Sequence, residues 1–298
     1  MNVLVSGANG LIGSALLPVL SRQGFLTSTL TRSPVPQDGN AVSWDPDAGT
    51  FSRDALEGVD AVVHLAGESI VGRWTAARKA RIRQSRIQGT QLLANTMARM
   101  QHPPKVFVCA SAIGYYGDRG EEMLDESSAS GNDFLSSVCQ SWEAAALAAK
   151  ERGIRTAHLR FGVVLSKKGG ALQKMLTPFQ LGMGGPMGSG KQYWSWIAVD
   201  DVVGAIEHAL TNDKVSGPVN AVAPAPATNA VFTKILAQAL RRPAFMPVPR
   251  FAARLLLGEM ADALLFASTR VTPRRLKETD YRFRLPELDA ALRYILAN

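Results

Sequence analysis

The sequence is poor in cysteine, with Cys109 and Cys139 as the only two among its 298 residues. The pair fits neither a disulfide framework nor a zinc-ligand spacing, and the four histidines are scattered along the chain. We therefore expect a protein of a reducing compartment, and we expect no metal site.

Long apolar runs are also missing. No stretch approaches the roughly 18 apolar residues of a membrane-spanning helix. The N-terminus lacks the basic segment and the long apolar segment of a signal peptide. These absences predict a cytoplasmic protein without a membrane span. Hydrophobic residues make up 46% of the chain, which is enough for a large core in one or two domains.

Negative charge is in deficit, since 33 lysines and arginines against 25 acidic residues give a formal charge of +8. Basic residues recur in two stretches, residues 73–86 and 270–284. Such an excess can serve nucleic acid, a membrane surface or an anionic small molecule. Neither stretch shows the regular interleaving of aromatic residues that stacks bases. We therefore expect a small anionic ligand and neither nucleic acid nor membrane as partner. The number of subunits stays open, with a homodimer as one option.

Strand-like and helix-like segments alternate through the first half of the chain. The strand-like segments are short apolar runs, and the helix-like ones have apolar residues at helical spacing. Alternation of this kind predicts a parallel sheet with helices on both faces. The expected strands are 2–6, 25–31, 61–65, 105–110 and 154–161, and the expected helices are 11–23, 75–100 and 134–152.

The pattern changes after Gly162, where glycine-rich loops interrupt it. Helices expected at 228–240, 250–267 and 286–297 would form a smaller lobe that closes over the ligand. The predicted fold class is therefore α/β, a Rossmann-type doubly wound parallel sheet with a smaller C-terminal α/β substrate lobe. The expected boundaries are 1–165 with 200–222 for the dinucleotide-binding domain, and 166–199 with 223–298 for the lobe.

A glycine-rich turn follows the first strand and opens the first helix. It reads Gly7-Ala8-Asn9-Gly10-Leu11-Ile12-Gly13. A helix N-terminus offers unpaired backbone N–H groups and a partial positive charge to a pyrophosphate. Glycine at the first position permits the tight turn, at the second it lets the backbone approach the phosphates, and at the third it lets helix and strand pack closely. Three glycines alone can mark any turn, but the strand before and the helix after favour a dinucleotide site.

The end of the second strand selects between the two nicotinamide dinucleotides. An acidic residue about 20 positions beyond the glycine turn would hold the ribose 2′-hydroxyl of NAD. No Asp or Glu occurs in residues 25–33, and Arg32 stands there between Thr31 and Ser33. A guanidinium can pair with a 2′-phosphate, and the hydroxyls add donors. This predicts NADP(H) rather than NAD(H), the alternative being an ordinary surface arginine after a strand.

These features resemble the extended short-chain dehydrogenase/reductase family, and more closely its atypical branch of epimerase family proteins. The resemblance implies a Rossmann domain with a small C-terminal substrate lobe. Its points run nearly end to end: Gly7–Gly13, Leu65-Ala66-Gly67-Glu68, Ser85-Arg86, Trp142-Glu143, Gly162–Leu165, Gly184–Gly190, Ala223-Pro224 with Thr228-Asn229, and the region of Pro273.

The resemblance extends the cofactor site beyond the glycine turn. The turn Leu65–Gly67 is expected to lie against the adenine ribose and the nicotinamide side, and Arg86 is expected to face the cofactor. Arg160 ends a strand at the nicotinamide end and, if buried, needs an anionic partner, either a phosphate or a carboxylate such as Glu68. The candidate cofactor-binding residues are Gly7, Asn9, Gly10, Leu11, Ile12, Gly13, Thr31, Arg32, Leu65, Ala66, Gly67, Arg86, Ala110 and Arg160.

The catalytic positions depart from the family pattern. Typical members carry Tyr-x-x-x-Lys on the helix after the fifth strand, where the tyrosine exchanges the proton and the lysine lowers its pKa. Ser111 matches the family's serine. With Glu143 as the anchor of the alignment, Leu135 stands at the tyrosine position and Cys139 at the lysine position, and no lysine occurs in residues 106–149. The usual proton relay is therefore missing.

Several groups could replace the relay. Tyr115, Tyr116 or Glu68 could supply a proton, and Tyr116 is the first choice, although the tyrosines could equally be packing residues. Cys139 is expected to be a buried, inert thiol. Ser111 and Tyr116 are thus the catalytic candidates. Possible walls of the substrate site, or else core residues of the lobe, are Met187, Gln192, Tyr193, Trp194 and Trp196.

The sequence thus predicts an NADP(H)-binding oxidoreductase or epimerase-like enzyme that acts on an unidentified small molecule. The alternative is a non-catalytic NADP(H)-binding redox sensor or regulatory protein, which would explain a retained phosphate site beside a lost Tyr-Lys pair.

Overall fold

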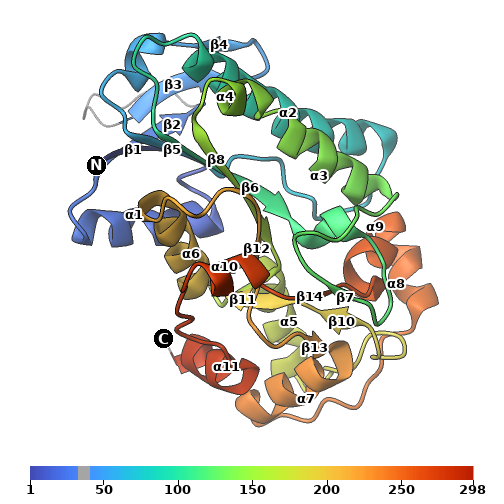
Figure 1. Cartoon of the computed structure of the whole chain (residues 1–298). Helices are drawn as coiled ribbons and strands as arrows, with labels where there is room; N and C mark the ends of the chain where they lie inside the picture. Colours follow the sequence, from blue (N-terminus) through green and yellow to red (C-terminus); the bar gives the residue numbers. More distant parts are fainter. Residues whose placement is uncertain (33–40, 298) are drawn as a thin grey trace.

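The structure, a computed structural model, describes residues 1–32 and 41–297. An eight-stranded sheet runs through it in the order β12-β8-β6-β5-β1-β2-β3-β4 (Figure 1). All neighbours pair in parallel except β3 and β4. The strands are β1 (Asn2–Ser6), β2 (Leu26–Thr31), β3 (Ala41–Asp45), β4 (Thr50–Phe51), β5 (Ala61–His64), β6 (Val106–Ala112), β8 (Arg155–Phe161) and β12 (Gly217–Ala221).

Helices cover both faces of this sheet, because successive side chains of each strand point to opposite sides. Val3 and Val5 pack with α1 (Leu11–Arg22) and α6 (Val199–Thr211). Leu4, between them, packs in a second core on the other face. That face carries α2 (Ala76–Ala98), α3 (Phe134–Ala144) and α4 (Leu147–Glu151). The predicted Rossmann-type architecture is confirmed.

The C-terminal part of the chain has a core of its own, in which Trp194, Trp196 and Phe232 are buried. Three two-stranded pairings lie outside the main sheet. They are β9 (Val163–Ser166) with β11 (Trp196–Ala198), β10 (Tyr193–Trp194) with β13 (Ala227–Thr228), and β7 (Met123–Leu124) with β14 (Arg270–Val271). The remaining elements are η1 (Arg53–Leu56), η2 (Ile113–Tyr116), α5 (Gly170–Gln180), α7 (Asn229–Leu240), α8 (Arg250–Leu257), α9 (Glu259–Ala261), η3 (Asp262–Phe266), α10 (Arg274–Glu278) and α11 (Leu288–Ala297).

Two predicted helices are each broken into shorter ones. The helix expected over 134–152 is interrupted at Ala145 and Ala146, whose N–H groups make i→i−3 bonds to Trp142 and Glu143. The helix expected over 250–267 ends at Gly258, where a backbone φ of +63° turns the chain out of the helix. The glycine-rich stretch after Gly162, expected to form loops, contains a further helix, α5, which begins at Gly170.

No helix in the described part of the chain is long and apolar enough to cross a membrane.

Candidate dinucleotide-binding and active site

Two loops meet where the strand order reverses, which is the place where doubly wound sheets bind their ligands. β1 lies between β2 and β5, and the loops that leave β1 and β5 touch each other. A Cβ atom on Gly7, which has φ +72°, would lie 2.7 Å from the carbonyl carbon of Leu65. Ser6 Oγ accepts the N–H groups of Leu65 and Ala66 at 3.2 and 3.3 Å. The turns predicted at 7–13 and 65–67 therefore form one surface.

The N-terminus of α1 opens onto this surface. Gly10 is its N-cap and is exposed, no side chain caps the helix, and no acidic residue lies in its first turn. Gly13 is buried against the preceding turn, and a Cβ atom there would lie 2.3 Å from the carbonyl oxygen of Gly7. Asn9 is exposed, and Leu11 and Ile12 are half-buried. Uncapped N–H groups and the positive end of a helix fit a pyrophosphate.

The end of β2 lies beside this surface, because β2 pairs in parallel with β1 and both strands end at the same edge. Thr31 is half-buried and Arg32 is exposed. Ser33, the third predicted contact of a 2′-phosphate, lies outside the described residues.

Arg86 packs under the turn that follows β5. Its Nη1 donates to the carbonyl oxygens of Glu68 and Ile82, both at 3.0 Å. The guanidinium lies 5.0 Å from the ring of Trp142, and a Cβ atom on Gly67 would lie 3.5 Å from its central carbon. Burial lowers the pKa of Arg86 from its ordinary value. The structure thus brings Arg86 and the Leu65–Gly67 turn together, as the resemblance implied.

A buried ion pair occupies the region predicted for catalysis. Arg160 Nε and Nη2 donate to the two carboxylate oxygens of Glu143, both at 2.8 Å. Ser111 Oγ donates to Glu143 Oε1 at 2.7 Å, and Ser111 and Arg160 face each other on β6 and β8. The anionic partner of Arg160 is therefore Glu143 and not Glu68. In the sequence, Glu143 served only as an alignment anchor, and no local pattern connects it with Arg160.

The polar contacts continue through Tyr116. Its Oη accepts Arg160 Nη1 at 3.0 Å and donates to Asn220 Oδ1 at 2.7 Å. Tyr116 has no exposed surface, and burial raises its pKa to about 12. Arg160 is 3% exposed. In this structure Tyr116 is buried within the network and Arg160 is paired with Glu143, so neither side chain is open to a ligand, and their predicted roles in catalysis and cofactor binding stay predictions.

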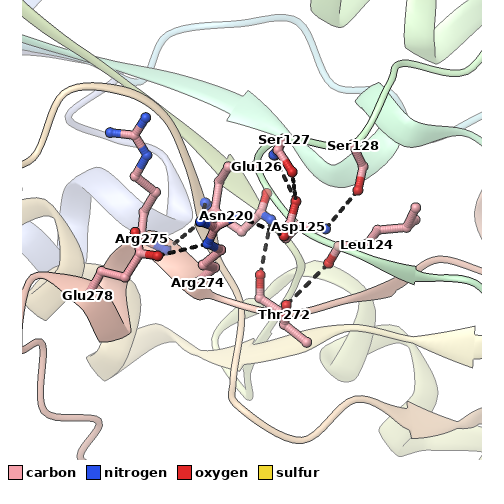
Figure 2. A network of polar contacts seen from close by, with 10 residues as sticks. All are labelled: Leu124, Asp125, Glu126, Ser127, Ser128, Asn220, Thr272, Arg274, Arg275 and Glu278. Atoms are coloured by element: carbon pink, nitrogen blue, oxygen red, sulfur yellow. Dashed lines mark hydrogen bonds and ion pairs between the residues drawn. The ribbon is translucent and has the colours of Figure 1, made fainter.

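From Asn220 the contacts reach the C-terminal part of the chain (Figure 2). The backbone N–H groups of Asn220 and Arg275 both donate to Glu126 Oε1, at 2.9 and 3.1 Å. Asn220 Nδ2 donates to the carbonyl oxygen of Thr272 at 3.0 Å. Burial raises the pKa of Glu126 from its ordinary value. One network thus runs from Ser111 to α10.

The residues at the family's catalytic positions are closed off as well. Ser111 is 2% exposed, and Ala110 before it is 7% exposed. Cys139 is 3% exposed, and burial raises the pKa of its thiol to about 12, so the thiol is neutral. Leu135 packs in an apolar cluster with Trp74. None of these side chains is open to a substrate.

The residues proposed as substrate walls mostly belong to the core of the C-terminal part. Trp194 and Trp196 are 5% and 0% exposed, and Trp194 packs on Phe232 with ring centroids 5.4 Å apart. Gln192 Nε2 donates to the carbonyl oxygens of Met187 and Leu265, both at 3.0 Å. For these three side chains the packing alternative is correct. Met187 and Tyr193 are half-buried.

Together, a parallel sheet with this strand order and an uncapped helix N-terminus at its switch point define a Rossmann-type dinucleotide-binding protein. The model of the NAD dependent epimerase/dehydratase family matches residues 3–222. The chain belongs to this family. A second model, described as a domain of unknown function (DUF1731), matches residues 248–295.

Relatives of the same length exist in bacteria and animals. The chain is 38% identical over 293 residues to "Epimerase family protein ML0860" of Mycobacterium leprae, covering 98% of this chain and 94% of the relative. It is 39% identical over 301 residues to "Epimerase family protein SDR39U1" of Homo sapiens, covering 100% of both. A crystal structure of the human protein (isoform 2) with NADPH superposes with a TM-score of 0.92 at 38% identity, covering 100% of both chains. These likenesses support a nicotinamide cofactor for this chain.

Proposed function

We propose that this protein is an NADP(H)-dependent oxidoreductase, epimerase-like in fold, that acts on a small molecule in the cytoplasm without nucleic acid or membrane as partner. The observation that carries the proposal is the contact between the Gly7 and Leu65 turns beside the uncapped N-terminus of α1. Uncapped N–H groups at the start of a helix fit an anionic diphosphate. The glycines, which have no side chain, let the protein backbone approach that diphosphate closely.

Two features support NADP(H) over NAD(H). Arg32 stands exposed after β2, where a carboxylate would repel a 2′-phosphate, and Thr31 adjoins it. The human relative, 38% identical, is described with NADPH bound.

When bound, the nicotinamide cofactor supplies or takes up a hydride. The protein itself holds the dinucleotide. The first turn of α1 would bind the pyrophosphate, and Arg32 would bind the 2′-phosphate. The Leu65–Gly67 turn and Arg86 would contact the nicotinamide side.

A turnover assay tests this function. Purified protein is incubated with NADPH and a panel of aldehydes, ketones and nucleotide sugars, and with NADP⁺ and secondary alcohols, while absorbance of the reduced cofactor is followed. We expect cofactor-dependent turnover with NADP(H) in preference to NAD(H). Failure of the protein to bind NADPH at all would overturn the proposal.

A second candidate is a non-catalytic NADP(H)-binding sensor or regulatory protein. The observation that favours it is the closure of Ser111, Tyr116 and Cys139, each at most 3% exposed. Tight binding of NADPH without turnover on the whole panel would select this candidate.

A further inference from the structure

Glu68 is an ionisable residue at the edge of the sheet where the parallel strands end. It follows the Leu65–Gly67 turn after β5 and is half-buried. Its backbone is fixed, because its N–H donates to Ser85 Oγ at 3.1 Å and its carbonyl oxygen accepts Arg86 Nη1 at 3.0 Å. Within residues 1–32 and 41–297, no hydrogen bond or ion pair engages its carboxylate. The backbone is therefore rigid while the acid group stays available.

The other acid–base groups of this region are not available. The Glu143 carboxylate is occupied by Arg160 and Ser111, at 2.7–2.8 Å. Tyr116 is buried, and its hydroxyl both donates and accepts within the network. Cys139 is a neutral thiol. Of the other two groups named as stand-ins for the missing tyrosine, Tyr115 lies with its ring 3.5 Å from the Arg160 guanidinium and 5.3 Å from the ring of Tyr116. Glu68 is the carboxylic acid of this set, and in the described residues no hydrogen bond or ion pair engages its acid group.

Arg86 lies beside both Glu68 and the residue at the family's lysine position. Burial lowers the pKa of Arg86, and the negative charge of Glu68 acts in the opposite direction. Nη1 is taken up by two carbonyl oxygens, whereas no hydrogen bond of the described residues uses Nε or Nη2. Arg86 thus places a cation, with donors to spare, next to Cys139.

We propose that Glu68 is the proton-exchanging group of this site and Arg86 its cationic partner, in place of the tyrosine and lysine that the chain lacks. This inference rests on the NADP(H) chemistry proposed above. The substrate class it implies is a small secondary alcohol or the corresponding ketone.

The proton step balances as follows. The O–H bond of the alcohol breaks and its proton forms a bond to a carboxylate oxygen of Glu68, which becomes a neutral carboxylic acid. The electron pair left on the substrate oxygen forms the C=O bond as the carbon loses its hydride to the nicotinamide cofactor. In the opposite direction, the Glu68 acid returns the proton to the developing alkoxide. The positive charge of Arg86 stabilises the ionised Glu68 carboxylate before the proton is transferred to it.

The charged and titratable groups around Glu68 come from two helices. α2 contributes Arg86 and also Arg78, whose Nη2 donates to the carbonyl oxygens of Ser69 and Val71 at 3.0 and 2.6 Å. α3 contributes Cys139 through its interaction with Arg86.

The test separates cofactor binding from proton transfer. We measure NADPH affinity by nicotinamide fluorescence between pH 5 and 8 for the parent, Glu68→Gln, Arg86→Met and the double variant, with the exposed Glu121→Gln as matched control. Removing a negative charge beside an anionic cofactor should leave the affinity of Glu68→Gln equal to the parent's or higher. Arg86→Met should lose about tenfold. The double variant should lose no more affinity than Arg86→Met alone.

Turnover of secondary alcohols with NADP⁺ is the second readout. A positioned acid or base contributes about 10²–10⁴-fold in rate, so Glu68→Gln should lower kcat by that factor while NADPH affinity holds, and Glu68→Asp should recover part of it. Three results overturn the inference: a Glu68→Gln variant with kcat within about threefold of the parent, a parallel loss of NADPH affinity and melting temperature, or a parent that binds NADPH and turns over no alcohol. A parent that does not bind NADPH overturns the proposed function itself.

Discussion

Ser6 Oγ lies 2.6 Å from His64 Nδ1, and both side chains are fully buried between β1 and β5. Ser6 Oγ already accepts two backbone N–H groups, so its own hydrogen must go to His64 Nδ1. Burial lowers the pKa of His64 from 6.5 to about 4, so its ring is neutral at neutral pH.

This neutral histidine predicts a loss of stability in mild acid. Below its ordinary pKa of 6.5 the unfolded chain takes up a proton at His64, whereas the folded protein does not until about pH 4. The stabilisation is thus complete above about pH 6.5 and is lost as the pH falls towards 4, a change of about 3 kcal/mol. Urea unfolding at a series of pH values measures it. His64→Gln should flatten the dependence, and the exposed His102→Gln should keep it. Equal slopes in both variants would contradict the assignment.

Replacing Gly10 by valine should abolish NADPH binding and leave the fold intact. Gly10 is exposed at the helix start, and a Cβ atom there meets only the carbonyl oxygen of Gly7, at 3.2 Å. A branched side chain would stand over the N–H groups that the pyrophosphate needs. Fluorescence titration and circular dichroism measure the two effects. Ser21→Val, at the exposed far end of α1, is the control and should bind normally. A Gly10→Val variant that binds NADPH would place the phosphates elsewhere.

Arg32→Ala should reduce the preference for NADPH over NADH. A charge-assisted contact with the 2′-phosphate contributes about 1.5–3 kcal/mol, or roughly tenfold or more in affinity. The loss should appear for NADPH and leave NADH unchanged, because NADH has no 2′-phosphate. The exposed Arg22→Ala, on α1, should alter neither affinity. If both cofactors bind the parent equally, Arg32 is a surface residue only.

Arg160→Met should destabilise the protein strongly. The change leaves Glu143 as a largely buried carboxylate without its cation, since the two side chains are only 3% and 14% exposed. Breaking a buried pair on one side costs about 3–5 kcal/mol. Arg293→Met removes the i,i+4 pair with Asp289, where the side chains are 66% and 49% exposed, and should cost less than about 0.5 kcal/mol. Comparable losses in the two variants, measured by denaturant unfolding, would show that burial is not what makes the first pair matter.

The glycine turn of the cofactor site could be predicted from the sequence, because the backbone conformation and the close packing that it needs involve only neighbouring residues. Gly7 needs a positive φ and Gly13 a missing Cβ, and both needs follow from one turn between one strand and one helix. The parallel sheet with helices on both faces followed from the alternation of strand-like and helix-like segments.

The polar network that runs from Ser111 to α10 could not be predicted from the sequence in this way. Glu143 and Arg160 meet because α3 packs over β6 and β8, and nothing in the residues between them signals the contact. The break at Ala145 and Ala146 was missed because alanine favours an unbroken helix, whereas tertiary packing ends it there.

The two family models divide the chain between residues 222 and 248, but the hydrogen bonds cross that division. Asn220 of the sheet bonds to Thr272, and Glu126 holds the first turn of α10 through Arg275. A fragment ending before residue 248 would leave these partners, and the pairing of β7 with β14, exposed to water. The boundary between the two models is therefore not a boundary of folding, and genetic fusion, truncation or lobe exchange at that point should yield an incomplete protein.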